Sequence, residues 1–98
     1  MKNFLDEVEG RVKSYKDEEE MRKAAADFML SSTKPKYCYN FSWQSRPIIQ
    51  YPQDMVAMQE IIWKVKPDLI IEMGVARGGS LIFSASLLLK IAWYKENI

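Results

Sequence analysis

A chain of 98 residues has room for one small domain, and its 48% hydrophobic content and formal net charge of +1 exclude a disordered polymer and give no support to nucleic-acid binding. Its single cysteine, Cys38, excludes an intrachain disulfide, and the lack of histidine removes the commonest metal ligand and general base. The N-terminus lacks the pattern of a signal peptide, and no apolar run reaches the roughly 20 residues of a membrane span. We therefore expect a soluble, cytoplasmic protein with no membrane span and no nucleic-acid partner.

The first 33 residues have the pattern of two amphipathic helices. In the first helix apolar residues recur at three- and four-residue spacing, namely Phe4, Leu5, Val8, Val12 and Tyr15. Asp17 and Glu20 have the spacing of a capping box, which predicts a second helix that starts there and runs to residues 31–33. The sequence thus indicates an N-terminal helical region over residues 1–33, followed by a different region over residues 34–98.

Residues 34–53 show no regular period. Pro35, Pro47 and Pro52 argue against a continuous helix or a central strand, so we expect an ordered loop. The loop is too aromatic for a solvated linker. Its rings either pack against a core or line one wall of a ligand cleft, because long irregular segments in compact domains are often binding loops. The candidates for such a wall are Tyr39, Asn40, Trp43 and Arg46.

A helix is then predicted from Pro52 to just before Pro67, with a core-facing stripe made of Met55, Met58, Ile61, Ile62 and Val65. Residues 68–73, DLIIEM, form a short β-prone apolar run that predicts a buried strand. Glycines follow in the turn, and a last helix is expected from Ser80 to about Lys95. That helix is apolar nearly all round, so it should be covered by a sheet and by neighbouring helices.

The glycine turn is the candidate binding site. It lacks the Gly-Lys-Ser/Thr of a P-loop, and its order, Gly74-Val75-Ala76-Arg77-Gly78-Gly79, lacks the second glycine of the dinucleotide fingerprint. What remains is Glu72 two places before a glycine, and a Gly-Gly-Ser helix start. This arrangement suits a ligand with a cationic or hydroxyl part near Glu72 and an anion near the helix N-terminus. S-adenosylmethionine carries both groups.

Only one strand is convincing in the whole chain, although a parallel strand followed by a crossover helix needs a neighbouring strand. We therefore expect residues 34–98 to be the aromatic loop, a helix and the first β-α unit of a larger, incomplete α/β domain. The alternative is a small helical bundle in which DLIIEM is an extended connector.

Two runs, YNFSW (39–43) and RPIIQYPQDMVAMQEIIWKVKPDLIIEMGVARGGSLIFSAS (46–86), closely resemble the cephalosporin hydroxylase family, which includes rhamnosyl O-methyltransferase-like proteins. The resemblance covers about half of the chain. It implies a class I S-adenosylmethionine-dependent methyltransferase fold, a doubly wound Rossmann-like sheet of which this chain would be an N-terminal fragment. It also implies that the first cofactor-binding motif corresponds to Glu72, Gly74, Gly78, Gly79 and Ser80. Arg77 stands at a position expected to vary.

The same resemblance implies what the chain does not contain. The family's acidic residue that holds the cofactor ribose, and the later carboxylates that bind a divalent metal such as magnesium, would lie beyond Ile98. We therefore expect part of an O-methyltransferase acting on a hydroxyl of a small molecule or glycan, compatible with a homo-oligomer and inactive as an isolated fragment. The catalytic base is not identified. A non-catalytic helical interaction module and a different nucleotide- or sugar-binding α/β enzyme are the alternatives.

Overall fold

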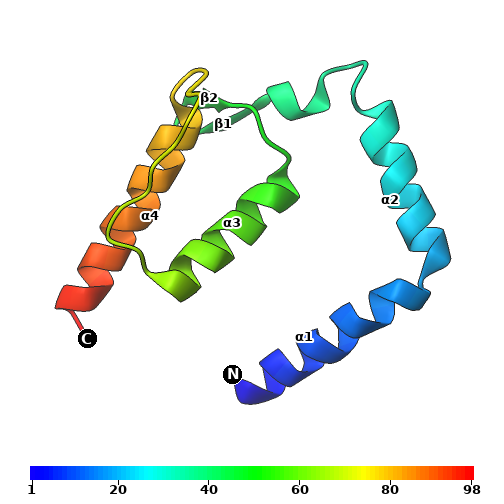
Figure 1. Cartoon of the computed structure of the whole chain (residues 1–98), viewed down its shortest axis with the longest axis horizontal. Coiled ribbons are helices and arrows are strands. Elements are labelled where there is room, and N and C mark those ends of the chain that lie inside the picture. The colour runs from blue at the N-terminus through cyan, green and yellow to red at the C-terminus, as the bar shows by residue number, and fades with distance from the viewer. The chain divides into compact units, whose positions relative to one another are not determined.

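The computed structural model describes all residues, 1–98, and divides them into two compact units, Met1–Pro35 and Lys36–Ile98. Figure 1 shows the course of the chain through both units. Residues 39–43 and 46–86, which resemble the cephalosporin hydroxylase family, lie within the second unit together with the glycine turn.

The first unit consists of helix α1 (Lys2–Ser14), the 3₁₀ turn η1 (Tyr15–Asp17) and helix α2 (Glu19–Ser31). Both helices were predicted, but the capping box was not correct. Glu18 is the N-cap of α2 and makes no side-chain cap hydrogen bond. The turn is held instead by Arg22, whose Nη1 donates to the carbonyl oxygen of Lys16 at 3.1 Å. Neither helix buries a residue within its bounds, so the apolar stripes of this unit lie exposed.

The second unit begins with the 3₁₀ turn η2 (Tyr37–Tyr39) and a β-hairpin of strands β1 (Phe41–Trp43) and β2 (Arg46–Ile48). The strands are antiparallel, with Ser42 opposite Pro47. The expectation of an ordered loop over residues 34–53 was therefore wrong for the part that forms this hairpin. Strands of three residues are too short to show a period in the sequence, and Pro47 is tolerated because a two-stranded sheet consists of edge strands only.

Helix α3 (Pro52–Val65) begins with proline in its first turn, as predicted, and ends before Lys66, whose φ of 49° is left-handed. Helix α4 (Gly79–Glu96) matches the predicted last helix. The rings of Trp63 and Tyr94 join the two helices edge to face, with centroids 5.0 Å apart. The buried hydrophobic residues are few: Ile48, Ile62, Phe83 and Ile91. The expected core stripe of α3 was thus largely wrong, since only Ile62 is buried in that helix.

Residues 68–73 do not form the predicted buried strand. The segment belongs to no helix or strand, and its alternate residues Leu69, Ile71 and Met73 are 72%, 80% and 95% exposed. No backbone-to-backbone hydrogen bond involves residues 67–77. The physical reason is the lack of a neighbour, because a β-prone sequence forms a ladder only when a second strand lies beside it. The fold is thus mostly helical with a two-stranded antiparallel sheet, which is compatible with the α/β class.

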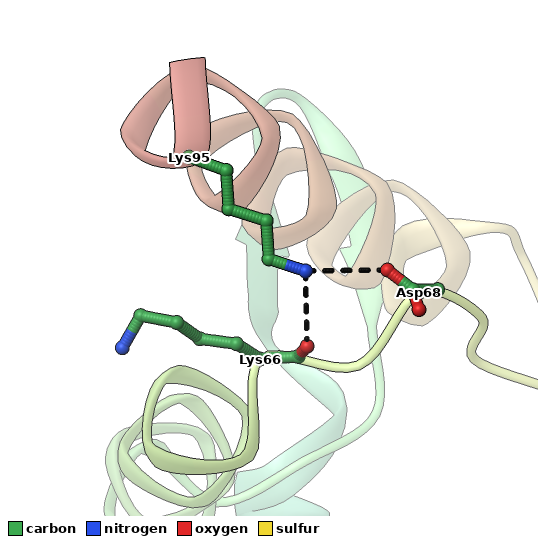
Figure 2. A network of polar contacts seen from close by, with 3 residues as sticks. All are labelled: Lys66, Asp68 and Lys95. Atoms are coloured by element: carbon green, nitrogen blue, oxygen red, sulfur yellow. Dashed lines mark hydrogen bonds and ion pairs between the residues drawn. The ribbon is translucent and has the colours of Figure 1, made fainter. Parts of the chain in front are cut away.

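The start of this segment is tied to the end of α4. Lys95 donates from Nζ to Oδ1 of Asp68 at 3.2 Å and to the carbonyl oxygen of Lys66 at 3.5 Å. In Figure 2 the side chain of Lys66 points away from this network. Between the segment and α4 lies an apolar groove of about 550 Å³, lined by Pro67, Asp68, Ala85, Leu88, Leu89, Ile91, Ala92 and Lys95. None of the helices combines the length and hydrophobicity needed to cross a membrane.

Candidate functional site

The glycine turn has a backbone that only glycine adopts easily. Gly74 and Gly78 have φ values of 78° and 86°, in the left-handed region that penalises a β-carbon by about 1–2 kcal/mol. A β-carbon at either position would meet no other atom within 4 Å, so the requirement lies in the backbone and not in packing. Gly78 is also the N-cap of α4. The glycines therefore allow the chain to turn from the extended segment directly into the helix.

Gly79 is required for a different reason. It is buried, and a β-carbon there would overlap the carbonyl group of Pro47 in β2. The hairpin is held in this place by its other residues. Ile48 is only 2% exposed, and the Trp43 ring meets Phe83 of α4 edge to face with centroids 4.7 Å apart. The hairpin backbone thus lies directly against the first residue of the helix.

Glu72 and the first turns of α4 are joined by hydrogen bonds. The Ser80 hydroxyl donates to Oε1 of Glu72 at 2.5 Å, and the Ser84 hydroxyl donates to the same oxygen at 3.1 Å. The other carboxylate oxygen, Oε2, has no hydrogen bond within the chain. The Ser80 hydroxyl is therefore already engaged, whereas Glu72 retains a free acceptor.

A cavity of about 250 Å³ lies between the glycine turn and the hairpin. One wall is made of Gly74, Ala76, Arg77, Gly78, Gly79 and Ser80, and the other of Pro47, Ile48, Ile49 and Gln50. Four of the five predicted cofactor residues therefore line it together, and the fifth, Glu72, is connected to it through Ser80.

The second wall comes from the aromatic segment, for which the sequence left open packing on a core or lining a cleft. Tyr39, Asn40, Trp43 and Arg46 do not line the cavity. Trp43 packs on α4 and donates from Nε1 to the Ser86 hydroxyl at 3.1 Å, and Asn40 donates to the carbonyl oxygen of Lys36. Residues 47–50 belong to the run that resembles the family, but no local pattern placed them opposite the glycine turn, because that position depends on the contact with Gly79.

The charge at the cavity favours an anion. The first bond of α4 runs from the Ile82 amide to the Gly78 carbonyl, so the N–H groups of residues 79–81 have no backbone partner. Arg77 lines the same cavity and belongs to none of the ion pairs of the chain. No cluster of three or more potential metal-ligating side chains is present. The arrangement can bind a small group that carries a carboxylate or another anion.

The same segments define the family. Residues 35–97 match the model of the family described as rhamnosyl O-methyltransferase/CmcI. This match covers well over half of the chain and includes the hairpin, α3, the glycine turn and the whole of α4. The protein therefore belongs to the rhamnosyl O-methyltransferase/CmcI family. No curated protein and no solved structure matches the chain.

Proposed function

We propose that this chain supplies the N-terminal part of an S-adenosylmethionine-dependent O-methyltransferase domain that acts on a hydroxyl of a small molecule or glycan. One observation carries the proposal: within the family match, the glycine turn and the start of α4 enclose a cavity with anion-binding character. The methyl group for transfer would come from the sulfonium of the bound cofactor.

In this proposal the chain's own residues bind and orient the cofactor. The left-handed backbone of Gly74 and Gly78 permits close approach of a ligand, and the free N–H groups of Gly79 and Ser80 are directed to its carboxylate. Glu72 contributes its unpaired Oε2 to a cationic or hydroxyl part. Positioning of this kind supplies much of the catalysis of a displacement reaction.

We also propose that the site is completed by polypeptide outside residues 1–98. The unpaired backbone of residues 67–77 and the apolar groove beside it support this view. A strand beside residues 68–73 would satisfy that backbone and cover the groove. Carboxylates for a divalent metal such as magnesium would also come from the added part. The isolated chain should then show no turnover and bind the cofactor weakly, with a Kd of about 1 mM or above, which corresponds to about −4.1 kcal/mol.

Two measurements test the proposal. In an NMR titration of the ¹⁵N-labelled chain with millimolar S-adenosylmethionine, the amide signals of Gly74, Gly78 and Gly79 should shift. Gly10, which lies in α1 of the other unit, serves as the internal control. If the three glycine signals of the turn do not move, the cofactor assignment is wrong. Calorimetry tests completeness separately, because a micromolar Kd for the 98-residue chain would contradict the need for added polypeptide.

A helical interaction module is the second candidate, and the surface of α4 favours it. Leu81, Leu89 and Trp93 are 51%, 73% and 55% exposed on that helix, as expected for a face that another protein covers. Such a module predicts mostly helical circular dichroism and no stabilisation by the cofactor. A thermal-shift series with S-adenosylmethionine separates the two candidates, because only a ligand that binds the folded state raises the midpoint of unfolding.

A further inference from the structure

Gln50 carries an unsatisfied acceptor. Its Oε1 is buried and has no hydrogen-bond partner, and it is the only side-chain nitrogen or oxygen of the chain in that state. Leaving a buried polar group without a partner typically costs about 1–3 kcal/mol. Folded proteins satisfy nearly all such atoms with protein, water or ligand partners, so this exception beside a cavity makes Gln50 the first residue to consider as a ligand contact.

The position of Gln50 relative to the glycine turn is fixed by packing. Gln50 follows β2 by two residues and lines the cavity opposite Gly78, Gly79 and Arg77. The close contact of Gly79 with the Pro47 carbonyl sets the separation of the two walls. The side chain is therefore held within reach of any ligand that fills the cavity. Because Oε1 itself is buried, it comes to face the ligand when the carboxamide rotates about its last bond and exchanges oxygen and nitrogen.

The cavity is large enough for only one end of the cofactor. About 250 Å³ is below the roughly 300–1,000 Å³ of sites that enclose a whole drug-sized ligand. A compact group that carries both an anion and a hydrogen-bond donor fits the charges better. An α-amino acid has this chemistry, with a carboxylate for Arg77 and the α4 N–H groups and an ammonium that can donate to an amide oxygen.

We propose that Gln50 binds the ammonium group of the cofactor's amino-acid end through Oε1. This inference rests on the proposed function and extends it to a residue of the hairpin. Arg77 and the start of α4 hold the carboxylate on one side, and Gln50 holds the ammonium on the other. The hairpin thus contributes directly to ligand binding, in addition to packing on α4.

The test follows the side-chain amide signal of Gln50 in the full 98-residue chain during three NMR titrations. S-adenosylmethionine and methionine should each shift this signal and the Gly78 and Gly79 amides, whereas adenosine, which lacks the amino-acid end, should shift none of them. If S-adenosylmethionine moves the glycine amides but not the Gln50 side chain, the inference is wrong and the proposed function stands. If it moves neither, both are wrong.

Variants give an independent readout. Gln50→Ala should weaken S-adenosylmethionine about three- to tenfold, the effect of one lost hydrogen bond. Its thermal midpoint should stay equal or rise, because the substitution removes an unsatisfied buried acceptor. Gln53→Ala, at an exposed position of α3, is the matched control and should leave the affinity unchanged. Unchanged affinity in Gln50→Ala, or a lower midpoint with no specific loss of binding, would overturn the inference.

Discussion

Gly79 of α4 touches the carbonyl group of Pro47, so that no side chain fits between the helix and the hairpin. This contact joins residues that are far apart in sequence and defines both walls of the candidate cavity. The cavity therefore depends on residue 79 being a glycine, which has no β-carbon. Its dimensions should change with any side chain introduced at that position.

Gly79→Ala should destabilise the second unit by about 1–3 kcal/mol, because overpacking forces the hairpin away from α4. The better helix propensity of alanine recovers at most about 1 kcal/mol of this loss. Urea unfolding followed by circular dichroism measures the change. Gly10→Ala is the matched control. It lies in α1 with no atom within 4 Å of its β-carbon, and it should stabilise its helix by about 0.5–1 kcal/mol.

The two hydrogen bonds that Glu72 accepts should contribute unequally to the free energy of unfolding. Ser80→Ala should cost about 1–2 kcal/mol, because it removes a short bond to a charged acceptor, and Ser84→Ala should cost less because its bond is longer. Hydrogen exchange at the Ile82 amide, which is bonded to the Gly78 carbonyl at the start of α4, would report the loss locally. Ser31→Ala removes an exposed hydroxyl bonded only within its own helix turn, and it should change the free energy of unfolding by less than about 0.5 kcal/mol. Equal effects of all three variants would contradict a specific role for Glu72.

Trp43 and Trp93 of the second unit should contribute differently to the free energy of unfolding. Trp43→Ala should cost about 3–5 kcal/mol, since it removes the contact with Phe83 and the hydrogen bond to Ser86. Trp43→Phe keeps an aromatic ring and should cost less. Trp93 is 55% exposed, so Trp93→Ala should have a clearly smaller effect. Chemical denaturation of the three variants under the same conditions ranks them, and a Trp93 effect as large as that of Trp43→Ala would refute the assigned core.

The ion pair between Lys95 and Asp68 should have little effect on stability. The Asp68 side chain is 96% exposed and that of Lys95 is 47% exposed, and ion pairs at the surface contribute about 0–1 kcal/mol. Asp68→Asn should therefore shift the midpoint of unfolding only slightly, and the shift should disappear at high salt. A large shift that persists in 1 M salt, about the concentration at which the Debye length is 3 Å, would show a buried role for Asp68 instead.

The helices were predictable because their signals are local. Spacing of apolar residues identified α1, the acidic residues near the start of α2 placed that helix, and Pro52 marked the start of α3. The hairpin was not predictable in this way. Its turn residues Gln44 and Ser45 have φ values of 48° and 69°, although neither is the glycine or asparagine that such turns prefer. Its strands are also too short for alternation to be visible.

The part of the candidate site that depends on local signals was predicted, and the part that depends on packing was not. Gly74 and Gly78 are recognisable because their backbone requirement is encoded in one residue each. The hydrogen bond from Ser80 to Glu72 joins the two ends of the glycine turn, which are only eight residues apart, so a contact of this kind can be inferred from the sequence. Gln50 was not, because its relation to the glycine turn arises only when the hairpin packs against α4. Residues 68–73 show the opposite error, since β propensity was mistaken for a formed strand.

The exposed, unpaired backbone of residues 69–73 also bears on how long the chain survives in a cell. Proteases bind their substrates as extended backbone, and cleavage concentrates where backbone is exposed and unpaired. Leu69, Ile71 and Met73 are exposed and lie in backbone without hydrogen bonds, so cutting there requires no unfolding of either unit. Mutations that raise global stability should therefore not prolong the lifetime of the chain. A variant that places proline or charge within residues 69–73 should lengthen this lifetime more than a variant that stabilises either unit.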